Sequence, residues 1–139
     1  MKYVSYKYRL YPTVKQKILL EKHFGSVRWI YNYGINKIDD HYKTTRKHLT
    51  YNELSKGLPI LNKQEETQFL AEVNQQSLNA ALRNLDKAYR GFFKGKNKHP
   101  KFKSRHRKQS VQFPQFNKID FNLSRLYVMK FREGIKMCI

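Results

Sequence analysis

The sequence predicts an α+β fold in which a helical unit is inserted into a small β domain. Three observations support this prediction: an alternating segment at the amino terminus, helical periodicity through the middle of the chain, and β-rich segments after residue 110. The chain has 139 residues, enough for one compact domain or two small intertwined ones, and 40% of them are hydrophobic, so a core can form.

The amino-terminal segment, residues 3–11, alternates between apolar and polar side chains, as a half-buried strand does. The side chains that would share its buried face are Val4, Tyr6, Tyr8 and Leu10. Pro12 ends the strand, because proline lacks the backbone N–H that a ladder needs. We expect this strand to pair with the strands that form late in the chain.

A pair of helices is predicted next. Thr13 and Gln16 form a capping-box pattern that begins the first helix, and Gly25 is well placed to end it. Ser26 can cap a second helix. The apolar residues of this second helix, which recur at helical spacing, are Val27, Tyr31, Ile35, Ile38 and Tyr42. Two helices joined by a tight turn have the outline of a helix-turn-helix, which by itself is a weak signal for DNA binding.

Three helical segments follow. Thr50 and Glu53 make another capping box, which opens a short helix that ends near Gly57. Residues 63–73 are expected to form one or two helical turns. The clearest helix covers residues 74–93. Its apolar stripe, the predicted core face, consists of Leu78, Leu82, Leu85, Tyr89 and Phe92 or Phe93.

The chain beyond Gly95, which closes the long helix, predicts strands. The expected strand residues on either side of Pro114 are Val111, Phe113 and Phe116. A hairpin is predicted from residues 119–128, with its turn at residues 122–125. The last nine residues, FREGIKMCI, show neither a closing helix nor a polar tail.

The charge balance indicates a polyanionic partner. The chain has 29 Lys and Arg against 10 Asp and Glu, a formal net charge of +19, which opposes compaction by self-repulsion. Nucleic acid is the leading candidate, because its phosphates reward each cation through counterion release. An anionic membrane surface is the weaker candidate, because no basic helix has a strong apolar face. We therefore expect no membrane partner.

The cations concentrate in KGKNKHPKFKSRHRK, residues 94–108, and no Asp or Glu occurs in residues 87–119. One interpretation is a flexible basic connector. The favoured one is a nucleic-acid track, in which an extended segment lines its cations along one side while Phe102, His99 and His106 offer stacking surfaces. The cations that we assign to phosphate or RNA-backbone contacts are Lys7, Arg9, Arg83, Lys94, Lys96, Lys98, Lys101, Lys103, Arg105, Arg107 and Lys108.

The start of the long helix is rich in amides, with Gln75, Gln76 and Asn79 close together. Asn and Gln can pair in bidentate fashion with adenine in the major groove, so these residues are candidates for reading bases. Amides at a helix start are also common capping residues, and that alternative stays open here.

Catalysis, metal binding and small-molecule binding find little support in the sequence. The ten acids show no convergent set for a two-metal nuclease, and the single cysteine, Cys138, excludes an intrachain disulfide and a thiolate zinc cluster. We expect no catalytic residue, no metal, no cofactor and no small-molecule substrate. The lack of a signal peptide and the cysteine usage indicate a reducing, cytoplasmic compartment.

Several motifs occur in an order that resembles a known family. They are KYRLYPT at residues 7–13, FGSVRWIYNYGI at 24–35, LNAALRNLDKAYRGFFKG at 78–95, PKFKSR at 100–105, and the following QSVQFPQF. In this set the chain is similar to the amino-terminal part of TnpB, also called OrfB. This family comprises transposon-encoded RNA-guided DNA endonucleases, often labelled transposases.

The resemblance implies a fold and a division of labour. Residues 1–12 and 96–139 would belong to a wedge-type β-barrel, here incomplete, and residues 13–95 to a helical recognition lobe inserted in it. The partners would be guide RNA and double-stranded DNA, with base pairing reading most of the target. The residues that the resemblance places opposite the short duplex motif are Tyr51, Ser55, Gln75, Gln76 and Asn79.

The resemblance also implies what this chain lacks. The family's catalytic acids and zinc-binding cysteines lie in a carboxyl-terminal half that these 139 residues do not include, so we expect the chain alone to be inactive. Two alternatives stay open. The chain could complete a nuclease supplied by a separate polypeptide, or it could be a stand-alone helix-turn-helix regulator, which should dimerise on a palindromic duplex.

Overall fold

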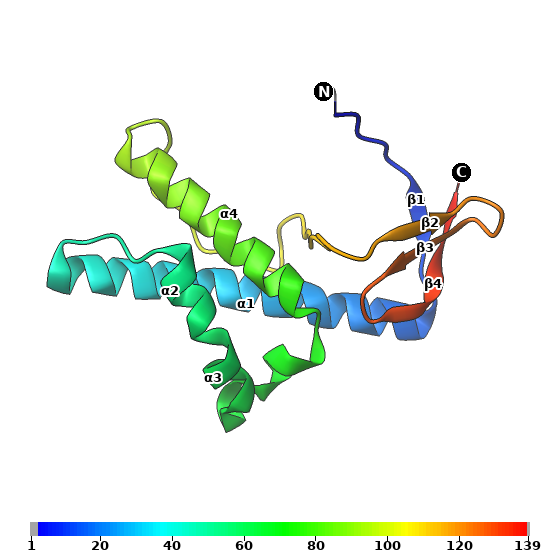
Figure 1. Cartoon of the computed structure of the whole chain (residues 1–139), viewed down its shortest axis with the longest axis horizontal. Coiled ribbons are helices and arrows are strands. Elements are labelled where there is room, and N and C mark those ends of the chain that lie inside the picture. The colour runs from blue at the N-terminus through cyan, green and yellow to red at the C-terminus, as the bar shows by residue number, and fades with distance from the viewer. Residues whose placement is uncertain (1–2, 139) are drawn as a thin grey trace.

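The computed structural model describes residues 3–138, which form an α+β fold with a four-stranded antiparallel sheet at one end and helices at the other. The predicted α+β class is confirmed, whereas the described residues form an open sheet and not the barrel that the resemblance implies. The elements in chain order are β1 (Arg9–Tyr11), α1 (Val14–Thr45), α2 (Tyr51–Lys56), α3 (Leu58–Lys63), the 3-10 helix η1 (Glu65–Glu72), α4 (Gln75–Phe93), β2 (Lys118–Asp120), β3 (Arg125–Val128) and β4 (Phe131–Cys138). Helix α1 reaches from the helical end to the sheet (Figure 1).

The sheet is open, with the strand order β1-β4-β3-β2. Its first strand comes before the helices and pairs with its last strand, Leu10 opposite Met137, so the helices are an insertion between paired strands, as predicted. The predicted hairpin is also confirmed: β2 and β3 pair antiparallel, with Ile119 opposite Leu126.

Residues 14–45 form one helix, α1, instead of the predicted pair of helices. The capping box at its start is confirmed, since the Gln16 N–H donates to Thr13 Oγ1 (3.2 Å) and the Thr13 N–H donates to Gln16 Oε1 (2.9 Å). The predicted Gly25–Ser26 turn is wrong, because one helix runs through it to Thr45. His23 and Ser26, on either side of Gly25, are both buried. Their burial on one helix outweighs the roughly 1 kcal/mol that a mid-helix glycine costs.

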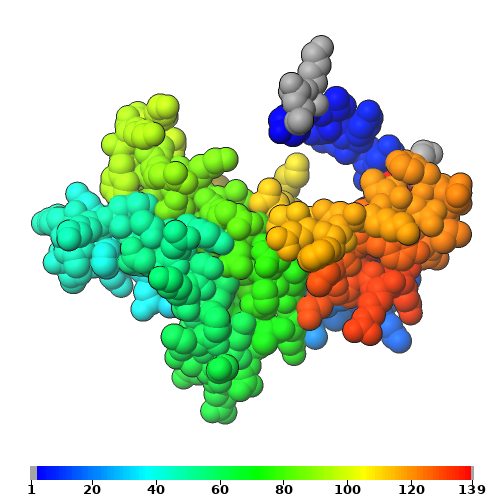
Figure 2. Space-filling view, in the orientation of Figure 1, coloured from blue at the N-terminus to red at the C-terminus, as the bar shows by residue number. Residues whose placement is uncertain are grey.

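The predicted strand at residues 3–11 is too long. Only Arg9–Tyr11 form ladder pairs, while Val4 and Tyr6 are 68% and 74% exposed. In the register of β1 with β4, Arg9 lies opposite Cys138, so the described part of β4 offers no partner to earlier residues. In the space-filling view the amino-terminal segment rises from the sheet and stands clear of the rest of the molecule (Figure 2).

Two further corrections concern the carboxyl-terminal third. No strand forms around Pro114; instead Val111 and Phe113 pack their side chains onto the helical core and the sheet core, respectively. Strand β4, which the sequence analysis missed, buries Phe131 and Ile135. Its alternation is broken at Gly134, which has a left-handed φ of 75°, so the period of two is not visible in the sequence.

The remaining helices follow the prediction more closely. The helix predicted from Thr50 begins there, but the Thr50 hydroxyl bonds to the Glu53 carboxylate (3.3 Å) and no side chain caps the backbone. The chain resumes as α3 directly after Gly57. The predicted turns before α4 are η1, and α4 has its expected stripe in the core and a left-handed Gly95 (φ 75°) just beyond its end.

His23 lies where the two cores meet. One core joins the helices; the other joins β3, β4 and the first turns of α1. The His23 Nδ1–H donates to the Leu19 carbonyl (2.9 Å), and Nε2 accepts from the Asn74 N–H (3.1 Å) at the start of α4. The aromatic rings of Phe113 and Phe131 pack beside the imidazole. Only the neutral ring can make both hydrogen bonds.

The continuity of α1 predicts opposite effects for two glycine substitutions. Gly25→Ala should raise the free energy of unfolding by up to about 1 kcal/mol, because alanine favours the helical conformation more than glycine does. The new Cβ would fit without a clash, since the nearest side-chain atom, in the guanidinium of Arg28, lies 3.7 Å away. Gly34→Ala should lower it by roughly 1–3 kcal/mol, because its Cβ would meet Leu85 at the crossing with α4. Urea unfolding measures both. A loss of stability in Gly25→Ala would indicate that the helix is broken there.

The burial of His23 predicts an acid-sensitive fold. Burial, and secondarily the charge of Lys130, lower the pKa of His23 from its ordinary 6.5, against a raising effect of its bond to Leu19. The unfolded chain therefore takes up a proton near pH 6.5 that the folded chain refuses, so stability should fall as the pH drops below about 6.5. Each unit of pKa lowering corresponds to about 1.4 kcal/mol.

Unfolding curves between neutral and mildly acidic pH measure this effect. His23→Gln should lower stability at neutral pH but flatten its dependence on acid, since glutamine has no proton to take up. His106→Gln, at an exposed position, is the control and should leave the profile unchanged. An equally acid-sensitive His23→Gln protein would contradict this assignment.

Candidate nucleic-acid interface

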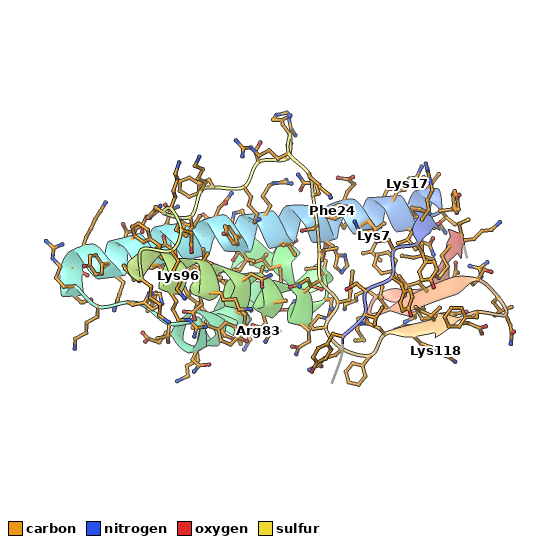
Figure 3. The ribbon with its side chains drawn as sticks, turned by 90° about the horizontal axis from the view of Figure 1, so that it is seen from above. Lys7, Lys17, Phe24, Arg83, Lys96 and Lys118 are labelled. Atoms are coloured by element: carbon orange, nitrogen blue, oxygen red, sulfur yellow. The ribbon has the colours of Figure 1, made fainter. Side chains whose placement is uncertain are left out.

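The basic segment, residues 94–110, has no helix or strand but is anchored to the helices along its length. Asn97 donates to the Ala88 carbonyl of α4 (2.9 Å). Asn32 of α1 holds the backbone of Lys103 on both sides: its Oδ1 accepts from the N–H (2.7 Å) and its Nδ2 donates to the carbonyl (3.0 Å). In Figure 3 the segment crosses over α1. These bonds favour the track interpretation over the flexible connector.

A cationic hollow of about 180 Å³ lies between the basic segment and α1. Five cations line it: Arg28, Lys101, Lys103, Arg107 and Lys108. Phe24 and Phe102 add apolar surface, and no carboxylate belongs to the lining. Arg28 is fixed by Gln109, whose Oε1 accepts from the guanidinium (2.9 Å). Such a concentration of unneutralised cations suits the phosphates of a nucleic acid.

The cations do not form the straight row that the sequence predicts. The backbone turns where the Arg107 N–H donates to the Ser104 carbonyl (3.2 Å), so the extended segment expected there is wrong. The turn gathers side chains from both of its arms around the hollow. All eight Lys and Arg of residues 94–108 are exposed. Within residues 3–138, no ion pair joins any of them to a carboxylate.

Lys103 is held by an aromatic ring. Its Nζ lies 4.6 Å from the ring centroid of Tyr31 on α1. Burial raises the pKa of Tyr31, so this ring stays neutral and interacts with the ammonium group through its π face. Because the Tyr31 ring is neutral, the ammonium group of Lys103 remains unneutralised in the lining of the hollow.

The predicted stacking residues differ in their surroundings. Phe102 is 57% exposed and lines the hollow, and His106 is exposed in the turn. His99 is tied to the protein, with its Nε2 3.0 Å from Asp39 Oδ1 and its ring edge-on to Phe92. Phe102 and His106 therefore offer free ring surface, and their contact with a base stays a prediction.

The predicted duplex-reading residues gather on α2 and α4. Ser55 donates to Asn79 Oδ1 (2.9 Å), and the Arg83 guanidinium lies over the ring of Tyr51 (5.4 Å) and donates to its hydroxyl (3.1 Å). Arg83, predicted from the sequence as a phosphate contact, thus shares this surface. Lys7 lies in the amino-terminal segment and Arg9 on β1, and both are exposed.

The two glutamines at the start of α4 differ. The Gln75 amide is fully engaged: Nε2 donates to the carbonyls of Leu70 (2.7 Å) and Val73 (3.1 Å), and Oε1 accepts from Asn62 (2.8 Å). Gln76 is half-buried, and its backbone N–H binds the capping Asn74. Base reading by either residue stays a prediction, and Gln75 would first have to release these internal bonds.

The two candidate surfaces lie on different sides of the helical unit. In Figure 3 the turn of the basic segment stands above α1, whereas Arg83 lies at the opposite side. The sequence analysis missed Arg28 and Asn32, which orient the basic segment. Their spacing of four places them on one helix face, a signal that the sequence does contain.

Residues 3–138 contain neither a membrane-spanning helix nor a cluster of metal ligands. No helix of residues 3–138 combines the length and apolar character that crossing a membrane requires. Across the same range, no three His, Cys, Asp or Glu side chains cluster so as to hold a metal ion.

Comparisons with known proteins agree with the motifs. Residues 1–47 match the family model of the OrfB (IS605-type) helix-turn-helix domain. The chain is 26% identical over 126 residues to "Putative RNA-guided DNA endonuclease InsQ" of Escherichia coli (strain K12), an alignment that covers 91% of this chain and 31% of that protein. It is 37% identical over 101 residues to a "Putative RNA-guided DNA endonuclease" of Streptomyces pristinaespiralis, covering 73% of this chain and 25% of that protein.

These matches confirm the predicted resemblance, and they cover a minor part of each relative: 31% of one and 25% of the other. The domain name contrasts with the local structure, because residues 14–45 of the matched region form one continuous helix.

The clamp by Asn32 predicts that the basic segment can be loosened selectively. Asn32→Ala removes two hydrogen bonds of about 1 kcal/mol each, so trypsin should cut within residues 101–108 about tenfold faster. Limited proteolysis with mass-spectrometric mapping measures the rate. Asn36→Ala, an exposed position one turn further along α1, is the matched control. Equal rates for both variants would show that other contacts hold the segment.

Proposed function

We propose that this chain is the nucleic-acid-binding amino-terminal part of an RNA-guided DNA endonuclease of the TnpB/OrfB type, because residues 1–47 match the OrfB helix-turn-helix model and its relatives are named putative RNA-guided DNA endonucleases. In this proposal the basic segment binds the guide RNA, and the surface of α2 and α4 reads a short duplex motif beside the target. Base pairing by the guide reads the remaining sequence.

The cationic hollow is the observation that carries the proposal. Five cations from two segments line it without a carboxylate, and internal hydrogen bonds hold the backbone of the segment before any ligand arrives. A preformed site loses less conformational entropy when it binds than a flexible tail does. A ribose-phosphate strand offers the anionic, regularly spaced groups that such a surface can neutralise.

The surface of α2 and α4 supports duplex reading. Tyr51, Ser55 and Asn79 lie close together with the cation Arg83, so one patch combines amide and hydroxyl groups with a phosphate-binding charge. Phosphate contacts position a protein on DNA, and base-edge contacts supply specificity. We propose that Asn79 and Gln76 contact base edges while Gln75 shapes the helix start.

The proposed domain division follows the family: residues 1–12 and 96–139 as part of a wedge, and residues 13–95 as the recognition lobe. The open sheet would be the portion of the wedge barrel present in this chain. DNA cleavage would depend on catalytic acids outside these 139 residues. The stand-alone regulator is less favoured, because the turn that its helix pair requires is absent from residues 14–45.

Salt dependence and sequence selectivity should separate the two surfaces. If the basic segment contacts several phosphates, the log–log slope of affinity against salt for RNA should be on the order of −6 or steeper. Lys101→Gln with Arg107→Gln should reduce the slope by about one unit per charge, equally for all sequences. Asn79→Ala should leave RNA affinity nearly unchanged but relax duplex selectivity by roughly 1–3 kcal/mol at one or two base pairs.

Filter binding at several salt concentrations and competition over randomised duplexes measure these effects. Lys63→Gln, which removes an exposed charge at the end of α3, is the control for charge alone. A salt slope near zero would contradict phosphate binding. Identical selectivity changes in the charge variant and Asn79→Ala would show that the amides only support the helix.

A further inference from the structure

A second hollow, of about 280 Å³, lies where the carboxyl-terminal ends of α1 and α4 meet the start of the basic segment. It is lined by Ile38, Asp39, Tyr42, Lys43, Tyr89, Phe92, Phe93 and His99. Five of these eight side chains carry aromatic rings, counting His99. The volume is just below the usual range for ligand pockets, so the hollow suits a small planar group.

The inner wall of this hollow is fixed by hydrogen bonds. Asp39 Oδ1 accepts from the Tyr89 hydroxyl (2.8 Å) and lies 3.0 Å from His99 Nε2. Burial, together with the bond to Asp39, raises the pKa of Tyr89, so the phenol keeps its proton and serves as the donor. The other carboxylate oxygen makes none of the hydrogen bonds found within residues 3–138, and the Asp39 side chain is 35% exposed. This second oxygen of Asp39 can accept a hydrogen bond from an N–H group of a ligand.

The rim combines exposed rings with cations. Tyr42 and Phe93 are 39% and 45% exposed, with ring centroids 5.7 Å apart, although both are large apolar groups. The Arg46 guanidinium lies 5.8 Å from the ring centroid of Tyr42, and Lys43 lines the hollow. Lys94, which follows Phe93 in the chain, is exposed. Exposed aromatic rings with cations beside them complement a ligand that has both a flat apolar surface and a negative charge.

A single-stranded nucleic acid has this chemistry. Each nucleotide carries a planar base and a phosphate, and unpaired bases bind proteins by stacking on aromatic side chains while cations hold the backbone. All four bases carry at least one N–H for the free oxygen of Asp39. Duplex DNA does not expose its base faces, so it is excluded as the ligand of this hollow.

We propose that this aromatic hollow holds one unstacked base of the bound single strand, against the exposed rings of Tyr42 and Phe93, with Lys43 and Lys94 on the adjacent phosphates. The inference rests on the proposed nucleic-acid binding and adds a base-binding site to it. The site lies at the start of the basic segment, so a strand that follows the segment towards the cationic hollow would begin here.

Two oligonucleotides of equal charge test the proposal. One is a single-stranded RNA of roughly 12 nucleotides, a length within known site sizes, and the other has the same backbone with abasic positions at its centre. Fluorescence anisotropy at fixed salt should show that the wild-type chain binds the abasic strand about tenfold or more weakly, since stacking contributes roughly 1–3 kcal/mol per base.

Leucine variants locate the effect. Phe93→Leu and Tyr42→Leu keep apolar side chains but remove the rings, so each should lose most of the discrimination against the abasic strand while the salt slope stays unchanged. Phe121→Leu, which removes a 61% exposed ring at the β2–β3 turn, should behave as wild type. Photocrosslinking of the wild-type chain to a 4-thiouridine strand should label peptides that contain Tyr42 or Phe93, and this readout needs no variant.

The outcomes separate this inference from the proposed function. Equal binding of both strands with a steep salt slope would leave nucleic-acid binding in place and overturn the base site. Discrimination that persists in both leucine variants, with crosslinks only at Phe102 or elsewhere, would also overturn it. Failure to bind either strand would overturn both proposals.

Discussion

Helix α1 runs unbroken through Gly25 and so connects the sheet core to the helical core. Its first turns pack on the sheet, where Gln16 donates from its side chain to the Gly134 carbonyl (2.6 Å), and its later turns pack on α4. A break at Gly25 would let the two cores move independently. The straight helix instead fixes the distance between the sheet and the helical end, and His23 joins both cores at the start of α4.

The same helix organises the charges of the molecule. Arg28 and Asn32 hold the basic segment in place, while two acids near the helical end, Asp39 and Asp86, bind other residues of the protein. Asp39 binds Tyr89 and His99, and Asp86 pairs with His48 and Arg90. The cations of the basic segment are therefore left without carboxylate partners among the described residues. The repulsion between these cations destabilises the folded chain, and a bound polyanion would relieve it.

Three surfaces divide the proposed recognition. In these proposals the cationic hollow binds phosphates, the aromatic hollow binds one base, and the patch of Tyr51, Asn79 and Arg83 binds a duplex. Each uses a different physical interaction: counterion release, stacking, or directed hydrogen bonds. Because the duplex patch and the basic segment lie on different sides of the helical unit, a guide strand and a duplex can be bound together without competing for the same side chains (Figure 3).

The features that could be predicted from the sequence are those with local causes: the capping box at Thr13, the apolar stripe of α4 and the β2–β3 hairpin. The basic segment and the resemblance to the TnpB/OrfB family were also visible in the sequence, because charge and motif order do not depend on the fold. Tertiary structure decided what depends on distant partners. Helix α1 continues through Gly25, where local propensity predicts an end, because His23 and Ser26 are buried on the same helix. Phe131–Cys138 form a strand because they pair with β3 on one side and with β1 on the other. The backbone turn at Ser104 arranges the cations around a hollow instead of in a row. Asn32 and Arg28, some seventy to eighty residues earlier in the chain, hold the two arms of this turn.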